Sequence, residues 1–326
     1  MSPSKSALAL ALALVAFVAT GCGLGGSGGG LGAPRTTTTD PPTTTTTIPK
    51  LDPAVPYAPQ PNEVEVELKQ AAADTLHALF TYEVGQGTIE AATQRLSGVP
   101  ALPEVATKAA PLLFVDLAAA ADIVYPQLGG LIPSKASVMT VVSLRTLRGS
   151  ERATVVRTMD VRLERRAGVW TVVDLPSLGG QRLERPPTLS AAAQRVLDHP
   201  QIEMPDTARW DIYGGKIADR ILETMASIAD TQPIAVTVLS TGHPLEVFGT
   251  ARPSNHIPGR GVDLWKVGSP VIDLRDPNGS LRPLVERLLG EGVTELGAPF
   301  DADGARPASF TNTVHLDHVH IAFDRL

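Results

Sequence analysis

The sequence predicts an α+β protein with two consecutive folded regions. Runs with helical and strand periodicity follow one another along the chain, and Pro186-Pro187 separates two such runs. The length of 326 residues fits about two domains at ~150 residues each. We therefore expect a domain of helices and an antiparallel sheet over residues 63–186. A small α+β domain, also with an antiparallel sheet, is expected over residues 187–326.

The first 22 residues predict a targeting signal. Residues 7–19 are apolar, but this run of 13 is too short to cross a bilayer, which takes ~20 residues, and it suits a signal peptide. Ala19-Thr20-Gly21-Cys22 resembles the lipobox of bacterial lipoproteins. The resemblance implies a lipid on Cys22 and anchoring at the extracytoplasmic face of the cell membrane. The alternative is an ordinary secretory signal in which Cys22 is incidental.

Residues 23–62 predict a disordered tether. The stretch GLGGSGGGLG is flexible and the stretch TTTTDPPTTTTTIP is extended, and neither composition can bury a core. An extended tether of this kind spans up to ~100 Å, which would place the folded regions away from the membrane, toward a cell wall.

The middle region predicts a scaffold or binding domain. Its expected elements are helices over residues 63–82 and 104–121 and strands over 138–147, 152–166 and 169–175. Turn signals at residues 148–150 and 167–168 make the strands a three-stranded antiparallel meander. We find no acid/base or metal-binding group of residues in this region.

The C-terminal region predicts helices packed on a sheet. The expected helices cover about 189–197, 216–229 and 281–289, and the expected strands cover 234–239, 262–265, 271–273 and 314–323, with a further short strand before Glu295.

Composition narrows the classes of function. The net charge of −6 argues against nucleic-acid binding, which normally needs a concentrated basic surface. Cys22 is the only cysteine, so the chain forms neither an intrachain disulfide nor a thiolate metal site. Any metal must be held by His and carboxylate groups. A periplasmic solute-binding protein is poorly supported, because the sequence lacks the two-lobed α/β repeat of that class. We also expect a monomer.

Histidines gather at the C-terminal end, where five of the seven follow position 242. On a strand, His318 and His320 share one face because side chains alternate with period two. His256 and Asp263 flank a Pro-Gly turn that lets them converge. Two imidazoles and one carboxylate are a normal ligand set for catalytic zinc. Asp317 is expected on the opposite strand face, paired with Arg306 or Arg325.

Two motifs resemble a known family. Ser254-x-His256-x-x-Gly259-x-Gly261-x-Asp263 is similar to the S-x-H-x-x-G-x-A-x-D motif of zinc D-alanyl-D-alanine carboxypeptidases and dipeptidases, and His318-Val319-His320 resembles their closing H-x-H. That superfamily also includes murein endopeptidase and hedgehog-like domains. The resemblance covers about residues 190–326. It implies Zn²⁺ bound by His256, Asp263 and His320, His318 in proton transfer or transition-state stabilisation, and peptidoglycan peptides as substrate.

The chain departs from the family at two places. Gly261 stands where alanine is usual, a mild change. Many relatives also carry a Ser-Gly-Tyr-Arg-like turn whose arginine stabilises the transition state, whereas this chain has Ser240-Thr241-Gly242-His243. The candidates to replace that arginine are Arg252, Arg260 and His243.

Two functions follow from these features. The first is zinc-dependent hydrolysis of peptide bonds in peptidoglycan stem peptides or cross-links, of the D,D-carboxypeptidase or endopeptidase type. The alternative, which the missing arginine favours, is a non-catalytic lipoprotein that binds the cell wall and retains the peptidase fold.

Overall fold

The computed structural model describes residues 49–271, 279, 281–304 and 306–325. The predicted signal peptide with Cys22, and residues 23–48 of the predicted tether, lie outside the described residues, as do residues 272–273 of a predicted strand. None of the helices in the described ranges is both long and apolar enough to span a membrane.

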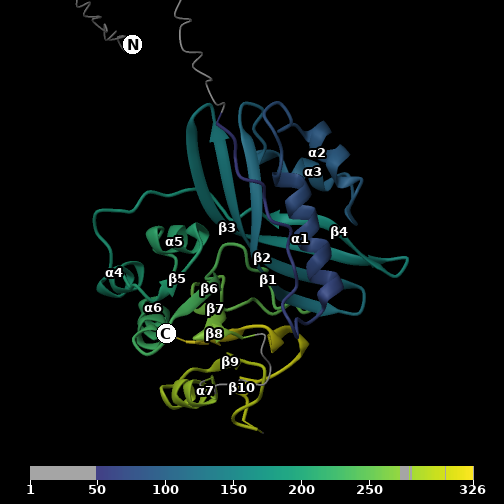
Figure 1. Ribbon diagram of the computed structural model, residues 1–326. Helices are drawn as coiled ribbons and strands as arrows, with labels where there is room; N and C mark the ends of the chain where they lie inside the picture. The colour runs from purple at the N-terminus through teal and green to yellow at the C-terminus, as the bar shows by residue number, and fades with distance from the viewer. Residues whose placement is uncertain (1–48, 272–278, 280, 305, 326) are drawn as a thin grey trace, which may run out of the picture. The chain divides into compact units, whose positions relative to one another are not determined.

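The first half of the described chain forms an antiparallel sheet with helices on one face. Its strands lie side by side in the order β1 (Ala118–Ile132), β2 (Lys135–Arg148), β3 (Glu151–Arg166) and β4 (Val169–Ser177). The helices are α1 (Val66–Phe80), α2 (Ile89–Leu96), α3 (Val105–Ala109) and the 3₁₀ turn η1 (Ala110–Leu112). Helix α1 crosses one face of the sheet (Figure 1), and its apolar residues Leu68, Leu76 and Leu79 are fully buried.

The two predicted hairpin turns are confirmed. Gly149 joins β2 to β3 with a φ of +59°, and Ala167-Gly168 joins β3 to β4 with φ values of 49° and 85°. Positive φ at both central residues, as at Ala167-Gly168, is what a type I′ turn requires, and positive φ at the first alone, as at Gly149, is what a type II′ turn requires. Both turns match the twist of antiparallel strands.

Strand β1 shows that the predicted helix over residues 104–121 is wrong at its C-terminal end. Helix α3 and the 3₁₀ turn end at Leu112, and β1 begins at Ala118. The alanine run Ala118–Ala121 pairs with Leu144–Leu147 of β2. The high helix propensity of alanine is worth only a fraction of a kcal/mol per residue, so pairing along a whole strand overrides it.

The segment before α1 is not free of the sheet. The Val55 amide donates to the Asp122 carboxylate at 3.2 Å, and the Arg145 guanidinium donates to the Asp52 carbonyl oxygen at 3.0 Å. The last part of the predicted tether therefore contacts side chains of β1 and β2.

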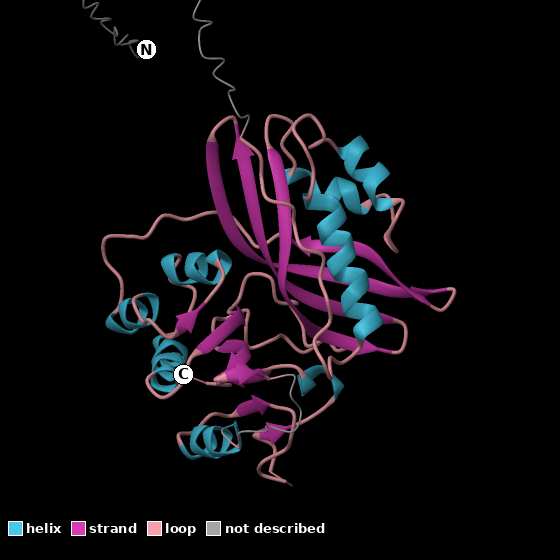
Figure 2. Ribbon diagram, in the orientation of Figure 1, coloured by secondary structure: helices cyan, strands magenta, loops and turns pink. Residues whose placement is uncertain are grey.

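The second half of the described chain holds a second sheet with helices around it (Figure 2). Its strand order is β10-β9-β11-β7-β6-β5, with β8 paired to β7. The strands are β5 (Ile202–Glu203), β6 (Ile234–Val238), β7 (Gly261–Val267), β8 (Ser269–Pro270), β9 (Glu295–Gly297), β10 (Ser309–Phe310) and β11 (Val319–Ala322). The helices are α4 (Ala191–Leu197), α5 (Asp206–Tyr213), α6 (Asp219–Ala229) and α7 (Leu281–Gly290).

This second sheet is mixed, whereas the sequence predicts an antiparallel one. The central pairs β6–β7, β7–β11 and β9–β11 are antiparallel, but β5–β6 and β9–β10 are parallel. The parallel pairs are two residues long and lie at the two edges, where such short strands leave little trace in the sequence pattern. The buried core includes Ile221 and Met225 of α6 and Val236, Leu264 and Ile321 of the sheet.

The final predicted strand, residues 314–323, is shorter than expected. Strand β11 covers only Val319–Ala322, and a 3₁₀ turn, η2 (Thr313–Leu316), precedes it. The Asn312 side-chain oxygen accepts hydrogen bonds from the amides of Val314 and His315 and so starts this turn. Residues 315–317 therefore do not alternate as strand residues, which changes the partners of Asp317.

Candidate metal centre

Two paired strands bring together Asp263 and His320. Strands β7 and β11 run antiparallel, and their register puts Asp263 directly opposite His320. Opposed residues on one face of such a pair have Cβ atoms about 4.5–5.5 Å apart. The Asp263 Oδ1 and His320 Nδ1 atoms lie 2.9 Å apart, and both side chains are buried.

His256 joins them from the loop that precedes β7. Its Nδ1 lies 2.7 Å from the carbonyl oxygen of Leu239, which can only accept, so Nδ1 carries the hydrogen. In a neutral ring, Nε2 then carries a lone pair. That Nε2 lies 3.1 Å from Asp263 Oδ1 and 3.2 Å from His320 Nδ1.

The three atoms have the spacing of metal ligands. They form a triangle with edges of 2.9, 3.1 and 3.2 Å. A tetrahedral metal with bonds of about 2.0–2.1 Å holds its ligands about 3.3 Å apart. A carboxylate oxygen and a lone pair of a neutral imidazole repel one another when buried side by side, unless a cation or a shared hydrogen, such as one on His320 Nδ1, lies between them. The donor set therefore fits a divalent metal ion.

His243 offers a further ligand atom at the same place. Ligand atoms of His243, His256 and Asp263 all lie within 4.8 Å of one another, and the rings of His243 and His256 stack with centroids 4.0 Å apart. The His243 Nδ1 lies 2.7 Å from the Pro244 carbonyl oxygen, which leaves Nε2 as the lone-pair atom. Burial, reinforced by His256, lowers the pKa of His243 well below its usual value. His243 is therefore a neutral imidazole at the metal centre.

His318 lies beside the triangle and points toward it. Its Nδ1 lies 2.7 Å from Asp317 Oδ1 and its Nε2 lies 3.9 Å from Asp263 Oδ2. Asp317 does not pair with Arg306 or Arg325 as predicted, because the 3₁₀ turn before β11 directs its carboxylate to His318 and to the buried Lys69. The carboxylate holds the hydrogen on Nδ1 and leaves Nε2 as the free nitrogen.

Arg252 also lines the centre, while Arg260 binds elsewhere. The Arg252 guanidinium forms two hydrogen bonds to Glu295, of 2.8 and 3.3 Å, and Asn255 donates to the same carboxylate at 2.6 Å. Arg260 donates to Asn255 Oδ1 at 3.0 Å and to the Asp324 carbonyl oxygen. Of the two arginines, Arg252 is the one that lines the cavity.

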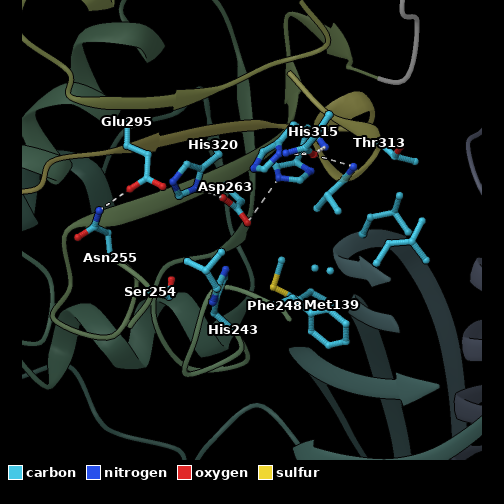
Figure 3. A pocket seen from close by; sticks show the side chains of 18 of the residues that line it. Met139, His243, Phe248, Ser254, Asn255, Asp263, Glu295, Thr313, His315 and His320 are labelled. Atoms are coloured by element: carbon cyan, nitrogen blue, oxygen red, sulfur yellow. Dashed lines mark hydrogen bonds and ion pairs between the residues drawn. The ribbon is translucent and has the colours of Figure 1, made fainter. Parts of the chain in front are cut away.

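The centre opens into a cavity of about 490 Å³ whose walls come from both halves of the described chain. Asp263, His315 and His320 point into it from one side, and Met139 and Phe248 face them from the other (Figure 3). Leu128, Gly129 and Gly130 of β1 complete this wall. The predicted scaffold thus forms part of the site.

Comparison of this chain with known proteins identifies no relative. No known protein family, curated protein or solved structure matches this chain. The function must therefore be argued from the arrangement of the residues themselves.

Gly259 shapes the turn between His256 and Asp263. Its φ is +71°, and a Cβ at this position would lie 1.8 Å from the Lys216 carbonyl oxygen. The backbone conformation alone costs a non-glycine residue about 1–3 kcal/mol.

We expect Gly259→Ala to lower the free energy of unfolding by at least ~2 kcal/mol, because the backbone clash adds to the cost of positive φ. Urea unfolding of the full chain measures this free energy of unfolding. Gly215→Ala is the matched control, since Gly215 has a φ of +66° with no atom near its Cβ position. Equal losses in both variants would contradict the role of the close approach.

Gln127 of β1 supports the metal centre from the first sheet. Its Nε2 donates to Asp263 Oδ2 at 2.8 Å, and the side chain is fully buried. Burial would raise the pKa of the Asp263 carboxyl, but His256 and His318 hold it well below its usual range. The carboxylate therefore stays ionised, with one oxygen toward the ligand triangle and the other held by Gln127.

We expect Gln127→Leu to weaken the binding of a divalent metal ion at this candidate centre about 10–100-fold, the usual cost of losing a hydrogen bond to a metal ligand. Competition with a chelating dye measures the affinity. Gln194→Leu, on the exposed side of α4, is the control with the same chemical change. An unchanged metal affinity in Gln127→Leu would show that Asp263 needs no such support.

Sequence reasoning missed Gln127, Glu295 and Lys69 as site residues. Gln127 and Glu295 stand in ordinary strand contexts. Lys69 does carry a signal, because it lies three and seven positions before Ala72 and Leu76, on the side of α1 that is otherwise apolar. A lysine on such a face needs a buried anionic partner.

Proposed function

We propose that this protein is a zinc-dependent hydrolase of peptide bonds in peptidoglycan stem peptides or cross-links, held at the outer face of the membrane by a lipid on Cys22. The observation that carries the proposal is the triangle of His256 Nε2, Asp263 Oδ1 and His320 Nδ1, with edges of 2.9–3.2 Å, beside His318. The two motifs that supply these residues are those that resemble the zinc D-alanyl-D-alanine peptidases.

Zinc suits this ligand set better than other common metals. Imidazole nitrogens favour zinc and other late transition metals, whereas calcium and magnesium prefer sites made only of oxygen. With His256, Asp263 and His320 as ligands and His243 beside them as an unbound imidazole, a coordination position stays open, which is the mark of a catalytic rather than a structural zinc site. When bound, zinc supplies a Lewis acid that polarises the scissile carbonyl group.

His318 is the residue for proton transfer. Asp317 accepts the Nδ1 hydrogen at 2.7 Å, so the free Nε2 faces the ligand triangle and can take up a proton there. A histidine oriented by a carboxylate in this way keeps one tautomer throughout the reaction. Asp317 is fully buried, and its hydrogen bonds fix the direction of the ring.

Arg252 provides a positive charge on the cavity wall. Glu295 takes two of its hydrogen bonds, and a guanidinium has five N–H groups to donate. The remaining donors suit a substrate carboxylate or a developing oxyanion. Arg252 is therefore our candidate for the role of the arginine that is missing from the Ser240–His243 turn.

The alternative, a cell-wall-binding protein without turnover, is tested by the same experiment. The zinc-loaded full chain in detergent is incubated with purified muropeptides. The products are separated by liquid chromatography and identified by mass spectrometry. The proposal predicts released D-alanine or separated cross-linked peptides. Bound muropeptides without new products would favour the alternative, and neither binding nor products would contradict both functions.

A further inference from the structure

A buried lysine from α1 reaches the residue behind His318. The Lys69 side chain is 0% exposed, and its Nζ lies 2.5 Å from Asp317 Oδ2 and 2.5 Å from Glu63 Oε1. Tyr125 OH lies 3.4 Å from the same Nζ and donates to the Asp317 carbonyl oxygen at 3.2 Å. A buried ammonium group is tolerated only when paired in this manner.

The Asp317 carboxylate has both oxygens engaged. Oδ1 accepts the His318 Nδ1 hydrogen at 2.7 Å, and Oδ2 accepts from the Leu128 amide at 2.9 Å and from Lys69. Lys69 and Leu128 lie about 190–250 positions away in sequence, in the first sheet and its covering helix. The orientation of the Asp317 carboxylate therefore depends on groups outside the C-terminal region.

We propose that Lys69 is a positioning residue for the reaction: by holding Asp317 Oδ2, it keeps Oδ1 on His318 and so keeps the free Nε2 of His318 directed at the metal centre. The proposal rests on the proposed function. It means that residues 63–186 act as a part of the catalytic unit, and that residues 187–326 alone would present His318 without this support.

The test must keep the buried charges balanced. Removing Lys69 alone would leave two uncompensated carboxylates at Glu63 and Asp317, which costs several kcal/mol and endangers folding. Glu63→Gln keeps the Lys69–Asp317 pair intact and serves as the reference. The double variant Glu63→Gln/Lys69→Met carries the same net charge in this cluster as the wild type, but Asp317 loses its cation.

We expect the double variant to lose about 10–100-fold in kcat relative to Glu63→Gln, the range found when a supporting hydrogen-bond partner is removed. KM should stay within about threefold, and one zinc per chain should remain. Glu63→Gln/Lys69→Gln keeps a neutral donor at position 69, so part of the lost kcat should return. If the methionine variant does not fold, the glutamine variant carries the comparison with the reference.

A second readout is independent of turnover. In ¹⁵N-histidine NMR spectra, His318 should show a single Nδ1–H tautomer in Glu63→Gln and a mixture in Glu63→Gln/Lys69→Met. Equal kcat and an unchanged tautomer in the two would overturn the positioning role. Absence of cleavage by the wild-type chain would instead overturn the proposed function, and the NMR comparison would still test Lys69.

Discussion

A His320→Ala variant is expected to lose stoichiometric zinc and, with it, peptide hydrolysis. His320 Nδ1 lies 2.9 Å from Asp263 Oδ1 and 3.2 Å from His256 Nε2, so its removal opens the ligand triangle. His256 and Asp263 remain, and the account requires that His243, whose ligand atom lies within 4.8 Å of theirs, does not take the place of His320. The Lewis acid in such an enzyme contributes several kcal/mol of transition-state stabilisation, so we expect kcat to fall by roughly 10³-fold or more.

Inductively coupled plasma mass spectrometry of the purified variant measures its zinc content and so checks the expected loss of zinc. His199→Ala is the matched control, because His199 contacts Asp230 at 3.3 Å and does not line the cavity. That control should bind one zinc per chain and keep its activity. A His320→Ala chain that still binds one zinc would show that the metal has other ligands.

A His318→Ala variant is expected to retain its bound zinc but to have a much lower kcat. His318 lies outside the ligand triangle, with Nε2 3.9 Å from Asp263 Oδ2, and its hydrogen bond to Asp317 orients it for proton transfer. General acid–base groups contribute about 10²–10⁴-fold, so kcat should fall by that factor. KM should change little, because the His318 ring transfers a proton and does not bind the substrate.

The measurement is steady-state cleavage of a muropeptide together with zinc content, again beside His199→Ala. The two histidine variants then separate metal binding from proton transfer. Loss of zinc in His318→Ala would make His318 a ligand, and full activity with zinc bound would remove it from the reaction.

The parts of the fold that follow from local patterns could be predicted. The β2–β3–β4 meander follows from alternating β-branched residues and from turns at Gly149 and Gly168, where positive φ favours glycine. Strand β1 could not be predicted in this way, because its alanines favour a helix until β2 is beside them. The 3₁₀ turn before β11 depends on one side chain, Asn312, capping two amides.

The residues of the candidate site could also be predicted only in part from the sequence. His256, Asp263 and His320 could be proposed as a set because two short motifs supply them, and the register of β7 with β11 places two of them opposite each other. Gln127 and Lys69 could not, since their partners lie 136 and 248 positions away in sequence. Only the packed fold brings such distant groups within hydrogen-bonding distance.

The central claim is tested most directly by a crystal of the zinc-loaded protein measured at the zinc absorption edge. The account predicts one anomalous peak per chain, bound by His256 Nε2, Asp263 Oδ1 and His320 Nδ1 at about 2.0–2.2 Å. A zinc ion bound by other side chains, or no peak between these three residues, would contradict it.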